Sequence, residues 1–130
     1  MPFIRLLGFE DRIISIMAYS LETVLAEKFE TIITRGVTTT RMRDFYDIYI
    51  LTNTQAFDRE IFKAALKKTV GKRGTIEQMA DIDNVIKMVS DSPIMIHLWG
   101  RYQAKFTYAA DVSWDMAIDA LNKLAQITIV

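Results

Sequence analysis

The sequence predicts a mainly α-helical domain, a bundle of about six helices behind one or two short N-terminal β-strands. Five glycines and two prolines in 130 residues leave few breaks, which favours helices over many short strands. Apolar residues also recur at helical spacing, and Ser, Thr or Asp stands where several of these segments begin. We expect a single domain over 1–130, with a short β edge at 1–18 and the helical bundle at 19–127.

The composition is that of a globular protein and excludes several kinds of site. Hydrophobic residues make up 51% and charged residues 25%, and the net charge of zero gives no general attraction to nucleic acid. The absence of cysteine excludes disulfides and thiolate metal sites, and the single histidine, His97, leaves almost no scope for zinc. The apolar runs are too short for a membrane span or a signal peptide, so we expect a cytoplasmic protein with no membrane contact.

The first elements follow from β-branched residues and from caps. The run Ile13–Ala18 is rich in β-branched residues and bounded by charge, so 4–18 is predicted to form two short strands. Ser20 is a good N-cap for the first helix. This helix is predicted to run to about Thr34, and Gly36 would close it.

Caps and periodicity place the remaining helices. A Thr-x-x-Gln capping box and a Ser-Pro pair are typical of helix N-termini. The predicted helices run from Arg41 or Met42 to about Thr52, from Asp58 to near Gly71, from the Thr75–Gln78 box through Val89, from Ser92–Pro93 through Phe106, and from Ser113 onward.

Lys28 falls near the centre of the apolar face of the first helix. At about 100° per residue, that face is made by the large apolar residues, while Glu22, Glu27 and Glu30 lie towards the other side. A lysine in such a place must extend its ammonium to solvent, lose its proton or find an anion. The apolar face consists of Leu21, Val24, Leu25, Phe29 and Ile32.

Asp44 and Asp47 stand on a second helix that is apolar almost all round. Because burial of unpaired charge is costly, Lys28 and one of these aspartates are expected to pair. One interpretation is a structural ion pair that locks the two helices together. The other is a lysine for a triphosphate and an aspartate for a metal or an attacking hydroxyl.

The segments that carry these residues resemble a known family. Tyr19–Glu30, Arg35-Gly36 and Arg43–Tyr49 are similar to the signature of the AbiEii/AbiGii toxins, DNA polymerase β-like nucleotidyltransferases of type IV toxin–antitoxin and abortive-infection (phage defence) systems. Trp99–Gln103 and Tyr108-Ala109 resemble the family's tail. The resemblance covers most of this chain. It corresponds to only about the second half of a family member, so the resemblance implies a truncated protein.

The resemblance implies a function for these positions. Lys28 would bind nucleotide phosphates, Asp44 would complete the catalytic site with Asp47 beside it, and Arg35 and Arg43 would bind substrate. The implied reaction uses Mg²⁺ and transfers a nucleotide from an NTP to an RNA acceptor, such as the 3′ end of a tRNA.

The family's Gly-Ser turn and strand-borne Asp-x-Asp, which hold the catalytic magnesium, have no counterpart in this sequence. Asp81-Ile82-Asp83 lies in a predicted helix, where alternate residues point apart, and we assign it to solvated helix surface. We therefore assign no metal ligand to the chain. We expect it to be inactive alone and to need a separately encoded N-terminal half. The alternative is a non-catalytic helical module that binds an antitoxin or forms a homo-oligomer through an exposed apolar patch.

Other candidates are weaker. The basic residues form two local clusters, of which the second, after the third helix, is expected to be solvated rather than to touch tRNA phosphates. His97 is expected at the rim of an apolar segment, and the aromatic residues of the last two helices are expected in the core rather than stacked on bases. The clusters are Arg35, Arg41 and Arg43, and Lys67, Lys68, Lys72 and Arg73, and the aromatic residues are Trp99, Tyr102, Phe106 and Trp114.

Overall fold

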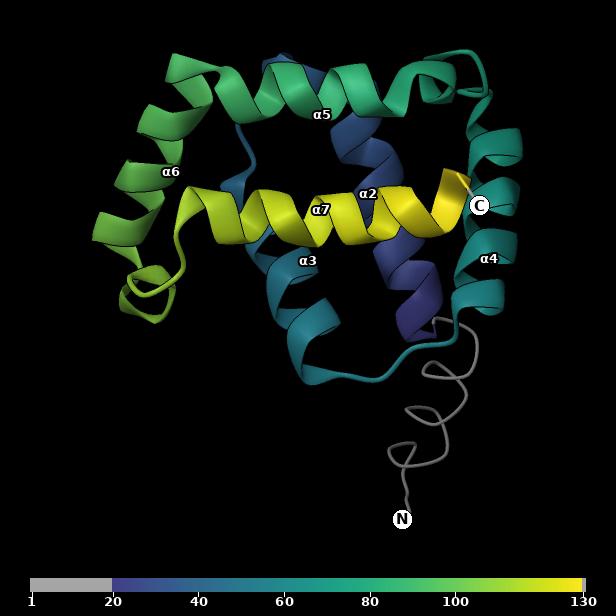
Figure 1. Ribbon diagram of the computed structural model, residues 1–130, viewed down its shortest axis with the longest axis horizontal. Coiled ribbons are helices and arrows are strands. Elements are labelled where there is room, and N and C mark those ends of the chain that lie inside the picture. The colour runs from purple at the N-terminus through teal and green to yellow at the C-terminus, as the bar shows by residue number, and fades with distance from the viewer. Residues whose placement is uncertain (1–19, 130) are drawn as a thin grey trace, which may run out of the picture.

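The part of the protein that the computed structural model describes, residues 20–129, consists of helices and the loops that join them (Figure 1). The strands predicted at 4–18 lie outside these residues. The described chain contains six α-helices joined by short loops and 3-10 turns, which confirms the predicted mainly α-helical class. The helices are α2 (Leu21–Arg35), α3 (Met42–Thr54), α4 (Arg59–Arg73), α5 (Ile82–Asp91), α6 (Pro93–Lys105) and α7 (Trp114–Ile129).

The C-terminal helix α7 crosses the middle of the molecule and packs on α3 and on α5 (Figure 1). Helix α2 lies behind it and makes its most extensive contact with α4, while α6 stands at the opposite end of the molecule from α4. Helix α3 touches α2, α6 and α7. The first turns of α3 are therefore the place where residues of α2 and α6 come together.

Large aromatic side chains fill the core where α3, α6 and α7 meet. The Trp114 ring lies 5.1 Å from Phe45 and 5.7 Å from Trp99, centroid to centroid. Trp99 is 1% exposed, and its indole N–H donates to the carbonyl of Val112 at 2.9 Å, so burial leaves no unpaired polar atom there. The predicted core role of Trp99 and Trp114 is confirmed, whereas Tyr102 and Phe106 are only half-buried.

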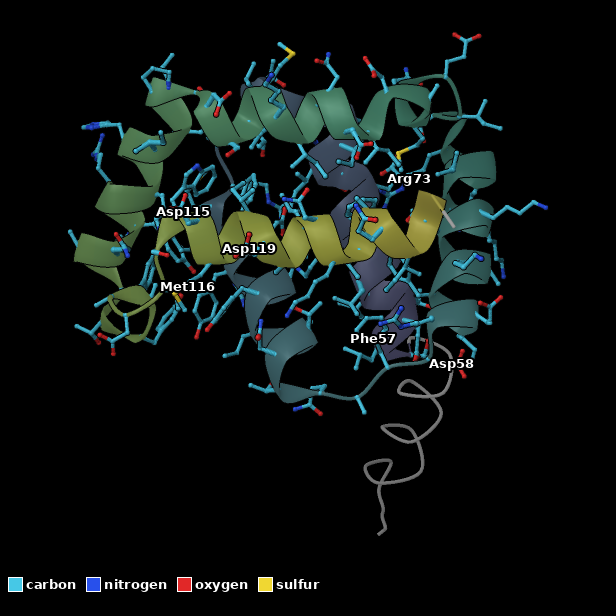
Figure 2. The ribbon with its side chains drawn as sticks, in the orientation of Figure 1. Phe57, Asp58, Arg73, Asp115, Met116 and Asp119 are labelled. Carbon is cyan, nitrogen blue, oxygen red and sulfur yellow. The ribbon has the colours of Figure 1, made fainter. Side chains whose placement is uncertain are left out.

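The predicted caps form at four helix starts. Ser20, Asp58, Ser92 and Ser113 each accept a hydrogen bond from the backbone N–H three residues on, at 2.9–3.3 Å. These bonds satisfy donors that a helix N-terminus otherwise leaves free. Asp58 also donates its own backbone N–H to Glu22 at 2.7 Å, which joins the start of α4 to the start of α2 (Asp58 is labelled in Figure 2).

The end of α4 differs from the prediction. Gly71 lies inside the helix, and Gly74 ends it in the left-handed conformation, with φ of +68°. The predicted Thr75–Gln78 capping box was wrong: Gln78–Asp81 forms a 3-10 turn and α5 begins only at Ile82. Ile76, which lies within the predicted capping box, is 73% exposed and does not face the core.

The reason for this difference is a buried carboxylate on α2. Glu30, expected on the solvated side of the helix, is 2% exposed. It accepts hydrogen bonds from the guanidinium of Arg73, labelled in Figure 2, and from the hydroxyl of Thr75 at 2.8 Å. The hydroxyl that would have capped a helix is thus used to satisfy a buried charge.

The described helices include none that has both the length and the apolar character needed to cross a membrane.

Candidate functional site

Lys28 bridges two aspartates across the contact between α2 and α3. Its Nζ lies 3.0 Å from Asp44 Oδ1 and 3.0 Å from Asp47 Oδ2. The two aspartates are three residues apart on a helix, so they project from the same face towards α2. The predicted pairing of Lys28 with one aspartate is confirmed, and the second aspartate takes part as well.

Two arginines at the start of α3 also contact these aspartates, so the charged residues form a larger cluster. Arg41 Nε lies 3.5 Å from Asp44 Oδ2, and Arg43 Nε lies 3.7 Å from Asp47 Oδ2. Both arginine side chains are more than half exposed, so these contacts are weak. We call Lys28, Asp44, Asp47, Arg41 and Arg43 the ion-pair cluster. It holds three cations and two carboxylates, so it carries net positive charge.

The members of the ion-pair cluster differ in burial. The Asp44 side chain is 5% exposed, whereas those of Lys28 and Asp47 are 23% and 24% exposed. Partial burial lowers the pKa of Lys28, but the hydrogen bonds and negative charges of Asp47 and Asp44 outweigh it and hold that pKa above its ordinary value. Lys28 is therefore charged at neutral pH, and part of its side chain is exposed to solvent.

The ion-pair cluster fits a phosphate group better than a metal ion on its own. Within residues 20–129 no three or more His, Cys, Asp or Glu side chains are grouped so that they would hold a metal. The two carboxylates of the cluster already share the ammonium of Lys28. Mg²⁺ is commonly held by one or two carboxylates together with water and substrate phosphates, so these two carboxylates fit only part of a magnesium site.

A group of tyrosines lies beside the cluster. The hydroxyls of Tyr102 and Tyr108 are 2.7 Å apart, and the Tyr46 ring lies 4.8 Å from that of Tyr108. Burial raises the pKa of Tyr102, and the hydrogen bond with Tyr108 and the negative charge of Asp47 raise it further. Tyr46 and Tyr108 were missed as neighbours of the site. Their only signal was that both stand in segments that carry the family resemblance.

A pocket of about 410 Å³ lies between the start of α3 and α6, and Arg41 and Arg43 are among its lining residues. Arg101 and Lys105 were not predicted as site residues, although they lie one helical turn apart and Arg101 stands in the segment that resembles the family's tail. We call this pocket the basic pocket. Its lining includes the basic residues Arg41, Arg43, Arg101 and Lys105 and the aromatic residues Tyr102 and Phe106.

The structure does not bring Arg35 to this site. Arg35 ends α2 and lines a separate small hollow of about 150 Å³ with Gly36 and Val85, so its role in substrate binding stays a prediction. Asp81 and Asp83 are exposed in the helical segment 78–91, which confirms their assignment to helix surface.

The second basic cluster, at the end of α4, divides in two. Lys67, Lys68 and Lys72 are exposed, as expected, whereas Arg73 binds the buried Glu30. His97 is exposed on α6.

Comparison with known proteins identifies the family of the chain. No curated relative and no solved structure matches the chain. A family model described as "Nucleotidyl transferase AbiEii toxin, Type IV TA system" matches residues 2–120, a range that contains α2, α3, α6 and every residue of the ion-pair cluster and the basic pocket. The chain belongs to the AbiEii nucleotidyl transferase toxin family of type IV toxin–antitoxin systems.

Proposed function

We propose that this chain takes part in transferring a nucleotide from a nucleoside triphosphate to an RNA acceptor, and that the ion-pair cluster binds the triphosphate. The observation that carries the proposal is Lys28 held at 3.0 Å from both Asp44 and Asp47. An ammonium fixed between two carboxylates keeps its charge and its position.

Lys28 has the donors that such a role needs. An ammonium has three hydrogens to donate, and the contacts to Asp44 and Asp47 use two of them. The third is left for a phosphate oxygen. Because the cluster has one more cation than carboxylates, an arriving triphosphate meets net positive charge. The positive end of the α3 dipole lies at the same place.

Asp44 and Asp47 are proposed to act together with Mg²⁺ that arrives with the triphosphate. In nucleotidyl transfer such an ion neutralises charge that develops on the phosphates. Asp44, almost fully buried, would orient Lys28 and hold it charged, and the more exposed Asp47 would share that task. The sequence has no Gly-Ser pair, and the two aspartates of its Asp81-Ile82-Asp83 lie on helix surface, so neither corresponds to the metal-holding motif implied by the resemblance. We propose that a polypeptide segment outside this sequence supplies that motif.

The direct test is a magnesium-dependent titration of the purified chain with labelled nucleoside triphosphates. Lys28→Ala is compared with Lys87→Ala, which removes an exposed lysine from α5. We expect saturable binding by the natural chain and by Lys87→Ala, and at least about tenfold weaker binding by Lys28→Ala, the loss of one charge-assisted contact. Circular dichroism would establish that each variant is folded.

Two results would contradict the proposal. The first is no binding by the folded natural chain, and the second is equal binding by Lys28→Ala. Either would leave the ion-pair cluster as a structural lock and favour the alternative function, a non-catalytic helical module.

The acceptor is proposed to be RNA, with the 3′ end of a tRNA as the first candidate. A cognate antitoxin is the protein partner that the family implies.

A further inference from the structure

We propose that the basic pocket binds the phosphate backbone of a single RNA strand and stacks one of its bases on an aromatic ring. The inference rests on the proposed function in one respect, namely that the strand would be the acceptor. The binding itself is a separate property, because the pocket shares only Arg41 and Arg43 with the ion-pair cluster.

The charges of the basic pocket favour phosphate. Four cations line it from two helices, and none of the described residues that line it is acidic. Arg101 and Lys105, one helical turn apart on α6, make no ion pair with any other described residue. The other two cations make only the long contacts to aspartates given above. The chain as a whole is neutral, so this is a local excess of positive charge.

The aromatic residues of the pocket favour a nucleic-acid strand over a small anion. Tyr102 follows Arg101 and Phe106 follows Lys105 in the chain, and their ring centroids are 4.9 Å apart. Lys105 Nζ lies 5.4 Å from the centroid of Phe106. Cations next to aromatic faces are typical of proteins that bind single strands, because a base of any kind stacks on the ring while phosphates meet the cations.

The size and the place of the pocket fit one end of a strand. Its volume of about 410 Å³ is in the range of pockets that enclose a molecule of nucleotide size, and it is far too small for a duplex. Arg41 and Arg43 line the basic pocket and also contact Asp44 and Asp47. A strand in the basic pocket would therefore lie next to a triphosphate on Lys28.

The test measures fluorescence anisotropy of a short labelled oligoadenylate RNA against the full chain over a range of salt concentrations. We compare the natural chain with Arg101→Ala/Lys105→Ala, with Phe106→Leu, and with Lys67→Ala/Lys68→Ala as a control that removes two exposed lysines of α4. We expect the first variant to bind at least about tenfold more weakly, with the salt slope reduced by about two. We expect Phe106→Leu to weaken binding with its salt slope unchanged, and the α4 control to bind as the natural chain does.

Four results would overturn the inference. The first three are no binding by the natural chain at low salt, equal losses in the α6 variant and the α4 control, and equally tight binding of a duplex. Displacement of the RNA by ATP without magnesium would also overturn it, because the basic pocket would then be the triphosphate site. Arg101→Ala/Lys105→Ala leaves the ion-pair cluster intact and is expected to keep its triphosphate affinity, so failure of the triphosphate proposal and failure of this one are distinguishable.

Discussion

The side chains of Lys28 and Asp44, sixteen residues apart in the chain, meet at 3.0 Å across the contact between α2 and α3. The Asp44 side chain is almost fully buried, and about a quarter of the Lys28 side chain is exposed. The ammonium therefore neutralises a buried carboxylate whether or not a nucleotide is bound. Lys28 joins two helices as well as offering a donor to phosphate, so stability and binding must be measured together in its variants.

Replacing Lys28 with methionine is expected to lower the free energy of unfolding by about 2 kcal/mol. The methionine keeps the packing of the stem but leaves Asp44 with Arg41, at 3.5 Å, as its only ion-pair partner among the described residues. Urea unfolding measures the difference. Asp47→Asn is the matched comparison and is expected to cost less, since Asp47 is more exposed. An unchanged unfolding midpoint for Lys28→Met would contradict the structural role of the pair.

The stability of the protein is expected to fall at alkaline pH. The folded-state pKa of Lys28 lies above its ordinary value of 10.5, so the stabilisation from its pairs is complete below that pH and is lost as the pH rises through the folded value. The pKa of Tyr102 is also raised above its ordinary 10.0. Because the unfolded chain then releases this proton first, stability again falls as the pH rises above 10.0.

Urea midpoints measured between about pH 8 and pH 11 check this prediction. Lys28→Met and Tyr102→Phe should each reduce the alkaline slope, because each removes a group that the folded state holds protonated. Arg101→Ala, which removes an exposed cation near Tyr102 without removing either titrating group, is the control. Slopes that are identical in all four proteins would contradict the prediction.

Local signals predicted most of the fold. Caps such as Ser20 and Ser113 were found because their hydrogen bonds join residues three apart. The pairing of Lys28 was found because a charge on an apolar stripe needs a partner. Glu30 and Thr75 were not found, because their contact joins positions 45 residues apart and depends on how α4 packs against α2.

The candidate site was predicted only in part, for a similar reason. Asp44 and Asp47 were found on one helix, but the contribution of both to Lys28 depends on how α2 meets α3. The basic pocket forms where α6 passes the first turns of α3, and no pattern within either helix indicates that contact. Arg101 and Lys105 are ordinary surface positions when α6 is considered alone.

Arg73 is expected to be the most important charged residue of α4 for stability. Arg73→Met would leave the Glu30 carboxylate buried with only the Thr75 hydroxyl as a partner among the described residues, at a cost of about 3 kcal/mol. Lys72→Met, its exposed neighbour, is expected to change little. Chemical unfolding compares the two. The double variant Glu30→Gln/Arg73→Met should recover part of the loss, because the buried group is then neutral, and a double variant less stable than Arg73→Met would contradict this account.

Two glycines at the end of α4 are expected to respond to alanine with opposite signs. Gly71 lies within the helix, and an added Cβ would meet no atom within 4 Å, so Gly71→Ala should stabilise the protein by about 0.5–1 kcal/mol. Gly74 has equally open surroundings but a φ of +68°, so Gly74→Ala should destabilise it by about 1 kcal/mol through backbone strain alone. Thermal unfolding of the two variants decides the matter. A gain for Gly71→Ala with a loss for Gly74→Ala would place the end of α4 at Gly74, whereas the reverse order would restore the end near Gly71 that the sequence predicts.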